Sequence, residues 1–197
     1  MKTMRRRKFS LVVAGVALAS VCLGGCSFMR GDDPEPTVKV NQAVKRVDSV
    51  LDDTVQAVLP RLKWRDGPVR TTERRNSFTN TANGELTVGR TRHVRTKVAK
   101  QKLAELLKVV DKHWRRAGFK IGQAHAEVPS LSGTAPDGCT VKFSVSGFGE
   151  VRFDAGVGAI SPGDGFHLDG EEGDTFPKAP NGGPDYTPDV QDPYWSK

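Results

Sequence analysis

The chain has 197 residues, 37% of them hydrophobic, and is therefore of single-domain length and long enough to bury a core. Its formal net charge of +7 would suggest a polyanionic partner such as nucleic acid. Five basic residues and no acidic residue precede Cys26, however, so the chain from Cys26 onward has a net charge of only +2, which excludes charge as an argument for nucleic acid.

The first 25 residues have the order of an export signal. A basic cluster at residues 5–8 precedes an apolar run at residues 11–23, and small residues follow, leading to Cys26. The apolar run is shorter than the roughly 20 residues that a membrane-spanning helix needs, and it is rich in small residues near its end. These features favour a cleavable signal over a transmembrane anchor.

Leu23-Gly24-Gly25-Cys26 resembles the lipobox of a bacterial lipoprotein signal peptide. The resemblance implies that the Cys26 sulfur receives a diacylglyceryl group and that cleavage makes Cys26 the first residue. The chain is similar to small lipoproteins of high-GC Gram-positive (actinobacterial) bacteria, which implies a lipid anchor on the extracytoplasmic face of the cell membrane and implies no activity. Two alternatives stay open: a secretory signal that is cut elsewhere, and export by either the general secretory or the twin-arginine route.

A tether and a helix are predicted next. Residues 26–37 contain charges and prolines with few apolar side chains, which predicts a flexible tether. From Val38 to Leu59 valines and leucines recur at steps of three and four residues, which predicts an amphipathic helix that ends at Pro60.

A hairpin and a second helix follow in the prediction. The extended stretches 69–79 and 85–97 flank the Asn83-Gly84 pair, which is typical of a tight hairpin turn. Residues 99–117 carry one apolar stripe with most lysines and arginines off it, which predicts a second amphipathic helix. Gly118 stands where a left-handed cap residue is expected.

Short strands complete the predicted domain. Apolar and polar residues alternate in 119–121 and again, on the opposite parity, in 124–128, with Gly122 between them. They alternate strictly in 139–145 and in 151–157, on either side of a turn. The order of helix, hairpin, helix and strands predicts one α+β domain over residues 38–160, with an antiparallel sheet and both amphipathic helices on one sheet face. The strand order does not follow from the sequence.

The last segment, residues 161–197, is rich in glycine and proline and poor in apolar residues. Such a composition buries too little apolar surface to offset its ordering entropy, so we expect a disordered acidic tail. Tyr194-Trp195 near its end is an aromatic pair able to dock on the domain or on a partner.

No catalytic, metal-binding or cofactor-binding motif stands out. Cys139 shares the strand parity of Val141 and Phe143, so we expect a buried core residue rather than a reactive thiol. With Cys22 removed and Cys26 acylated, Cys139 also has no disulfide partner within the mature chain. The four histidines lack ligand spacing, and the Gly-x-Gly pairs lack the third glycine of a dinucleotide loop. We therefore expect no enzyme, no metal and no cofactor, with weak calcium binding by the acidic tail left open.

Charge is segregated along the chain. Residues 61–120 hold 17 basic and 5 acidic residues, whereas residues 161–197 hold 8 acidic and 2 basic residues. One interpretation is a site for anionic lipid headgroups or wall polymers, with Arg90, Arg92, Arg95 and Lys97 as candidate residues. The other is that the basic segment pairs with the chain's own acidic tail.

The leading hypothesis is a lipid-anchored envelope protein that binds or scaffolds another envelope component without catalysis. Its partners are then the membrane, through the lipid, and an envelope protein or polymer, and not nucleic acid. One alternative is direct binding of an anionic envelope polymer through the basic segment, and another is an enzyme with an unrecognised site.

Overall fold

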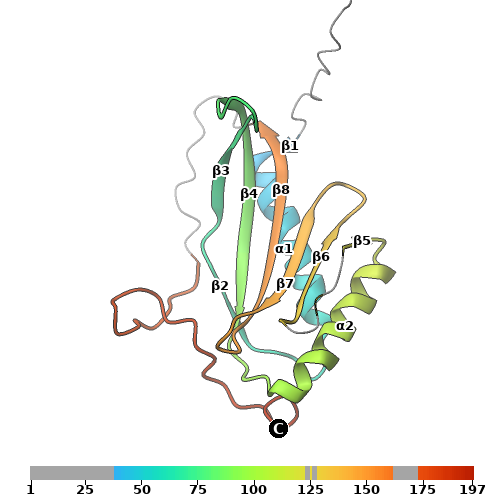
Figure 1. Cartoon of the computed structure of the whole chain (residues 1–197), viewed down its shortest axis with the longest axis vertical. Coiled ribbons are helices and arrows are strands. Elements are labelled where there is room, and N and C mark those ends of the chain that lie inside the picture. Colours follow the sequence, from blue (N-terminus) through green and yellow to red (C-terminus); the bar gives the residue numbers. More distant parts are fainter. Residues whose placement is uncertain (1–37, 123–124, 126–127, 162–172) are drawn as a thin grey trace, which may run out of the picture. The chain divides into compact units, whose positions relative to one another are not determined.

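A computed structural model describes residues 38–122, 125, 128–161 and 173–197, which belong to one compact unit (Figure 1). The predicted signal peptide and tether, residues 1–37, lie outside the described residues. In chain order the elements are β1 (Val38–Lys39), α1 (Val40–Gln56), β2 (Trp64–Asp66), β3 (Arg70–Arg75), β4 (Ala82–Val94), η1 (Lys100–Lys102), α2 (Leu103–Arg116), β5 (Lys120–Ile121), β6 (Ser130–Thr134), β7 (Thr140–Val145) and β8 (Val151–Ser161). None of the helices in this part of the chain is long and apolar enough to cross a bilayer.

The strands form one sheet in the order β2-β4-β8-β7-β6-β5, with β3 paired to β4 and β1 paired to β8. Strands β2 to β8 pair antiparallel, and only the two-residue β1 runs parallel to its neighbour. Both helices pack on the same face, α1 against β4 and β8 and α2 against β5 and β6. The predicted α+β arrangement of an antiparallel sheet and two helices on one face is thus confirmed.

Each helix turns its apolar stripe toward the sheet. In α1 the buried side chains include Val44, Val47 and Leu51, and in α2 they include Leu106 and Val110. The two helices also meet through a buried hydrogen bond, in which Trp114 Nε1 donates to Thr54 Oγ1 at 2.9 Å. After α2, Gly118 adopts a φ of +81°, the left-handed conformation expected of the residue that ends a helix.

The first hairpin turns at a different place from the one predicted. Arg75 of β3 lies opposite Ala82 of β4, so residues 76–81 form the loop and the Asn83-Gly84 pair lies inside β4. Asn76 closes the longer loop, because its Oδ1 accepts the backbone N–H groups of Phe78 and Thr79 at 2.9 and 3.1 Å. The hairpin thus turns at the Asn76 loop and not at the predicted Asn83-Gly84 pair.

Some of the later strands match those predicted from the alternation of apolar residues. β7 and β8 confirm the strands predicted at 139–145 and 151–157, with Val141, Phe143 and Phe153 buried between sheet and helices. β6 was not predicted, because it alternates Leu131 with the small buried Gly133 and therefore shows a weak apolar period. The strand predicted at 124–128 is wrong at Val128, which lies in an exposed turn, while 124, 126 and 127 lie outside the described residues.

The prediction of a disordered tail does not hold for residues 173–197, which pack against the domain; residues 162–172 lie outside the described residues. Trp195 is fully buried, and its Nε1 donates to the carbonyl oxygen of Pro60 at 2.7 Å. The backbone of Val190 forms a parallel bridge with Thr96, just beyond β4. One aromatic anchor and a few backbone hydrogen bonds order this segment, and neither leaves a periodic pattern in the sequence.

Candidate functional site

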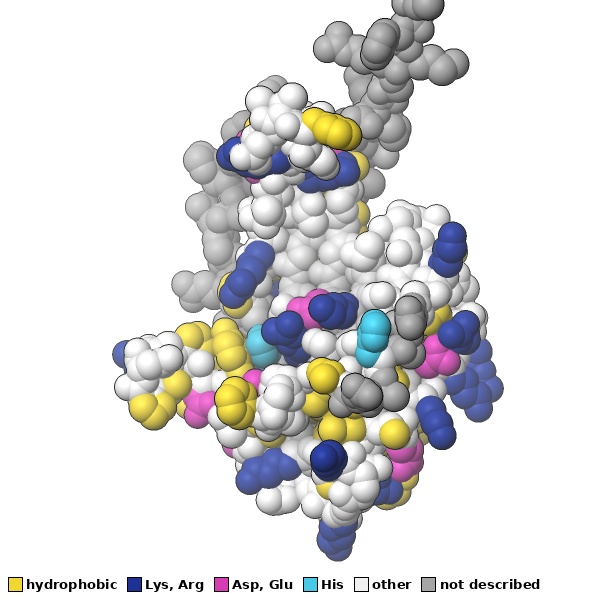
Figure 2. Space-filling view, in the orientation of Figure 1, with side chains coloured by type: hydrophobic (Ala, Val, Ile, Leu, Met, Phe, Trp, Pro, Cys, Tyr) yellow, Lys and Arg dark blue, Asp and Glu magenta, His cyan; other side chains and the backbone are white. Residues whose placement is uncertain are grey.

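The arginines predicted to bind a polyanion do not share one exposed surface. Arg90 and Arg92 have the same strand parity as the buried Val88 and Val94, so they point toward the helix-covered side of the sheet. Arg90 Nη1 donates to Asp48 of α1 at 2.8 Å. In Figure 2 the Lys and Arg side chains are spread over the visible side of the molecule rather than gathered in one patch.

Arg92 is the most enclosed of these arginines, with its side chain 3% exposed. Its Nε and Nη2 donate to the two carboxylate oxygens of Asp66 at 2.6 and 2.9 Å, and its Nη1 donates to Asp52 at 2.8 Å. The guanidinium also lies 5.0 Å from the centre of the Trp64 ring. Burial disfavours the charged form, but the hydrogen bonds to both carboxylates outweigh burial and raise the pKa of Arg92. This arginine is part of the folded core and is not available to a polymer.

Arg95 and Lys97 lie where β4 gives way to the connection toward α2. Arg95 donates through Nε and Nη2 to both carboxylate oxygens of Asp189, each at 2.8 Å, while the Lys97 side chain is exposed. This hydrogen bond lowers the pKa of Asp189. At Arg95, therefore, the basic segment pairs with the chain's own acidic tail, as the second interpretation of the charge pattern expected.

Cys139 and the lipobox residues are the other candidates that the sequence offered. Cys139 is fully buried and forms no disulfide, as expected, and burial raises the pKa of its thiol. The predicted lipidation residue Cys26 and its lipobox neighbours Leu23, Gly24 and Gly25 lie outside the described residues. Across the portion of the chain that the structure covers, no group of three or more His, Cys, Asp or Glu is placed to hold a metal ion.

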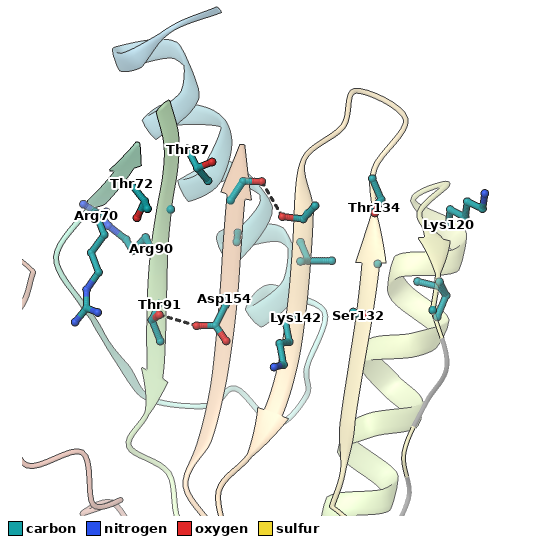
Figure 3. A pocket seen from close by; sticks show the side chains of 18 residues that line it. Arg70, Thr72, Thr87, Arg90, Thr91, Lys120, Ser132, Thr134, Lys142 and Asp154 are labelled. Carbon is teal, nitrogen blue, oxygen red and sulfur yellow. Dashed lines mark hydrogen bonds between the residues drawn. The ribbon is translucent and has the colours of Figure 1, made fainter. Parts of the chain in front are cut away.

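A broad hollow of about 850 Å³ lies on the face of the sheet that the helices leave uncovered, which we call the open face (Figure 3). Alternation along each strand places every second side chain on this face. Those side chains are mainly glycine, threonine and serine, and in Figure 2 the region over β4, β8 and β7 is accordingly white. The open face is thus a surface of backbone and hydroxyl groups with few apolar side chains.

The strand register lines up one row of residues across the hollow, which we call the glycine row. Neighbour by neighbour, the row is Arg70 of β3, Gly89 of β4, Gly156 of β8, Thr140 of β7, Thr134 of β6 and Lys120 of β5. A basic residue stands at each end, and only small side chains lie between. With strands about 4.8 Å apart, five spacings separate the two basic residues by roughly 24 Å along the sheet.

The two glycines leave the floor of the hollow bare. A Cβ atom at Gly156 would lie 3.5 Å from Thr140 Oγ1 and 3.5 Å from the Val88 carbonyl oxygen, which is ordinary contact. At Gly89 it would lie 3.1 Å from the Ala155 carbonyl oxygen, which is tighter. Packing therefore does not demand a glycine at 156, and a larger side chain there would stand up into the hollow.

A second row runs beside the glycine row and carries charges of both signs. Thr91, Asp154, Lys142 and Ser132 are successive neighbours in it. Thr91 Oγ1 donates to Asp154 Oδ1 at 2.6 Å, and Arg152 lies 3.6 Å from the other oxygen of that carboxylate. Within the described ranges no ion pair involves Arg70, Lys120 or Lys142, so the hollow has an excess of uncompensated positive charge.

The C-terminal segment bounds one end of the open face. His93 has the same parity as Thr91, and its ring stacks on Tyr186 with a centroid distance of 4.0 Å and meets the edge of Phe176 at 5.4 Å. Burial lowers the pKa of His93. Residues 173–197 thus cover His93 near the end of β4 as well as completing the core.

Sequence reasoning missed this surface because the register that joins five strand pairs cannot be deduced from one sequence. The signal that could have found it is the run of small residues on the outward parity, such as Thr87, Gly89 and Thr91 in β4. Comparison of the chain with models of known protein families, with curated proteins and with solved structures found no significant match. The functional argument therefore depends on the site itself.

Proposed function

We propose that this protein is a non-catalytic binding protein of the cell envelope, anchored through a lipid on Cys26, and that its open face holds an elongated anionic ligand. The observation that carries the proposal is the glycine row, with Arg70 and Lys120 at its ends and a bare floor between them. The anchor is supported by the lipobox Leu23-Gly24-Gly25-Cys26.

The shape of the hollow favours a chain-like ligand. Two cations roughly 24 Å apart are too distant for one small anion to bridge, whereas a polymer with repeated charges can meet both. Between them, the Thr134 hydroxyl can donate to or accept from hydroxyl-bearing units of such a polymer. The Thr140 hydroxyl can accept, because its proton is donated to the Gly156 carbonyl oxygen at 3.1 Å. An anionic wall polymer combines both properties.

The chemistry of the open face favours binding over catalysis. Asp154 is the carboxylate that lines the hollow, and it accepts a hydrogen bond from Thr91 and faces the nearby Arg152. Both oxygens of this carboxylate are thus engaged, and among the described residues no histidine or cysteine lines the hollow beside the Thr hydroxyls.

The polymer-binding residues in this proposal differ from those predicted from the sequence. Arg90, Arg92 and Arg95 are compensated by the chain's own aspartates, so a polymer would have to break ion pairs to reach them. Arg70, Lys120 and Lys142 take over that role, because they are exposed at the hollow.

Binding should be tested with the chain lacking residues 1–26 and two anionic probes, a phosphodiester-linked polyol and a uronic-acid polysaccharide, with a neutral glucan for comparison. We expect binding to one or both anionic probes that weakens as salt rises. Replacing Gly156→Val should weaken binding by about tenfold or more, because the new side chain occupies the floor.

A charge-matched control separates the site from general attraction. The double substitution Lys120→Gln and Lys142→Gln should weaken binding, whereas Lys108→Gln with Lys112→Gln, which removes the same charge from the exposed side of α2, should not. Equal losses in both double variants, or no binding to either anionic probe, would contradict the proposal.

The anchor has its own test. Growth of a bacterial host with a fatty-acid analogue should label the protein, and Cys26→Ala should abolish both the label and the cleavage before residue 26. Label that persists in the Cys26→Ala protein would contradict lipidation at this residue.

A further inference from the structure

The loop between β3 and β4, residues 76–81, presents an aromatic side chain to solvent, and we call this loop the hairpin tip. Phe78 is 98% exposed there, the most exposed large hydrophobic side chain among the described residues. Figure 2 shows hydrophobic atoms beside Lys or Arg side chains at the upper end of the molecule, where β3 and β4 meet. A fully exposed phenylalanine gives the folded domain no burial energy.

The hairpin tip is held in one conformation by its own hydrogen bonds. Besides the two bonds to the Asn76 side chain, Asn80 N donates to the Asn76 carbonyl oxygen at 2.9 Å, and Asn76 N donates to the Thr81 carbonyl oxygen at 2.8 Å. Arg75 Nη1 donates to the Asn80 carbonyl oxygen at 3.1 Å. These bonds use backbone and polar side chains, so loop closure does not require an aromatic residue at position 78.

The hairpin tip lies at the end of the sheet where the chain enters the domain. Val38 of β1 pairs with Ile160 of β8, and Ile160 pairs with Leu86 of β4, from which the hairpin continues outward. Residues 26–37 number twelve, and twelve extended residues span at most about 40 Å. A lipid on Cys26 would therefore hold this end of the sheet within about 40 Å of the bilayer.

The opposite end of the sheet offers a natural comparison. Phe148 lies in the turn between β7 and β8, just before Val151, at the far end of β8 from Ile160. It is 94% exposed, almost as much as Phe78. The tether attaches at Val38, which lies near the hairpin tip and the full length of β8 away from Phe148, so the hairpin tip is the end of the sheet nearer to the anchored end of the chain.

Basic residues flank the aromatic side chain. Arg74 pairs with Glu85 and Arg75 with Glu73, and both guanidinium groups remain about half-exposed. With Arg70, the hairpin from 70 to 85 has one more basic than acidic residue. This charge suits a surface of anionic headgroups but is small, so the aromatic ring supplies most of the expected attraction.

We propose that the hairpin tip is a second membrane contact, in which Phe78 enters the interfacial layer of the lipid bilayer and Arg74 and Arg75 lie at headgroup level. The inference rests on the proposed lipid anchor at Cys26, which supplies the proximity. Two points of attachment orient the domain, so that the strands stand away from the membrane and the open face looks sideways into the wall.

The test uses the lipidated protein in vesicles of phosphatidylcholine and phosphatidylglycerol, with a fluorescent label on a single introduced cysteine. Because Cys26 is acylated and Cys139 is buried, the label goes to Ser77→Cys or, in the matched control, to Gly147→Cys. Both positions are exposed neighbours of the two phenylalanines, so Phe78 and Phe148 stay in place. Brominated lipids should quench the label at position 77 and leave the label at position 147 unchanged. Flotation of the protein with the vesicles reports the lipid anchor separately.

Each outcome has one meaning. Flotation with quenching at 77 alone supports the second contact. Flotation without quenching at 77, or with equal quenching at 77 and 147, overturns it while leaving the anchor in place; failure to float contradicts the anchor itself. As an unlabelled check, Phe78→Trp should add tryptophan emission that shifts to shorter wavelength with vesicles, whereas Phe148→Trp should add emission that does not shift.

Discussion

The two faces of the sheet place basic residues in opposite settings. On the covered face, Arg90 and Arg92 of β4 are enclosed and paired with aspartates of α1 and β2. On the open face, Arg70 and Lys120 stand exposed at the ends of a row of small residues. Basic residues of the single sequence segment 61–120 are thus divided by the fold into a group that stabilises the domain and a group that can meet a ligand. Substitutions on the covered side should cost stability, and those on the open face should cost binding.

The largest effect on the covered side should come from the C-terminal anchor. Trp195→Ala removes a fully buried indole and its hydrogen bond to the Pro60 carbonyl oxygen, so the free energy of unfolding should fall by about 3–5 kcal/mol. Urea denaturation followed by far-UV circular dichroism measures it. Tyr194→Ala, which removes the exposed neighbour, should cost clearly less; equal losses would mean that Trp195 is not the anchor.

The next effect should come from the ion pair of Arg92, which is enclosed on the arginine side. Asp66→Asn removes the carboxylate that accepts hydrogen bonds from two nitrogens of Arg92, and losing these charge-assisted bonds should cost about 2 kcal/mol. Asp52 contacts the same arginine through one nitrogen and is half-exposed, so Asp52→Asn should cost less in the same denaturation experiment. A larger loss for Asp52→Asn would reverse our assignment of the main partner.

The sequence predicts local elements much better than the residues that meet across them. Both helices, β7, β8 and Gly118 follow from period and cap chemistry, which act over a few residues. The glycine row depends on register between strands that are far apart in the chain, such as Gly89 and Gly156. The ordered C-terminal segment depends on Trp195 reaching Pro60, a contact that composition cannot show.

On the open face, in contrast to the covered face, substitution of a strand residue should have little effect on stability. Gly156→Val adds a side chain on a solvated strand position where the new Cβ meets only ordinary contacts, so unfolding free energy should change by less than about 1 kcal/mol. The same variant should bind the anionic polymer about tenfold or more weakly. A large loss of stability would mean that Gly156 serves the fold, and the difference between the two faces would fail at this position.

A smaller effect is expected where the acidic tail meets the end of β4. Asp189→Asn breaks the bidentate pair with Arg95, but both groups are partly exposed, so the loss of stability should be clearly smaller than that of Asp66→Asn. High salt should shrink the difference from the unsubstituted protein, because screening weakens exposed pairs. Unfolding curves at low and high salt measure it, and a cost as large as that of Asp66→Asn would remove the distinction between buried and surface pairs.

The smallest effect should appear as a pH dependence at the end of the open face. Burial lowers the pKa of His93 in the folded protein, so the unfolded chain takes up the proton first as the pH falls below the ordinary histidine value of about 6.5. The stability linked to His93 is therefore complete above that pH and declines as the pH falls through the lowered, folded-state pKa.

His93→Phe keeps an aromatic ring against Tyr186 and Phe176 but cannot be protonated, so its unfolding free energy should fall less than that of the unsubstituted protein between about pH 7 and about pH 5. His125→Asn, a substitution at an exposed histidine, should retain the full decline. If the unfolding free energy of His93→Phe falls as steeply with pH as that of the unsubstituted protein, Tyr186 and Phe176 do not shield His93 from water.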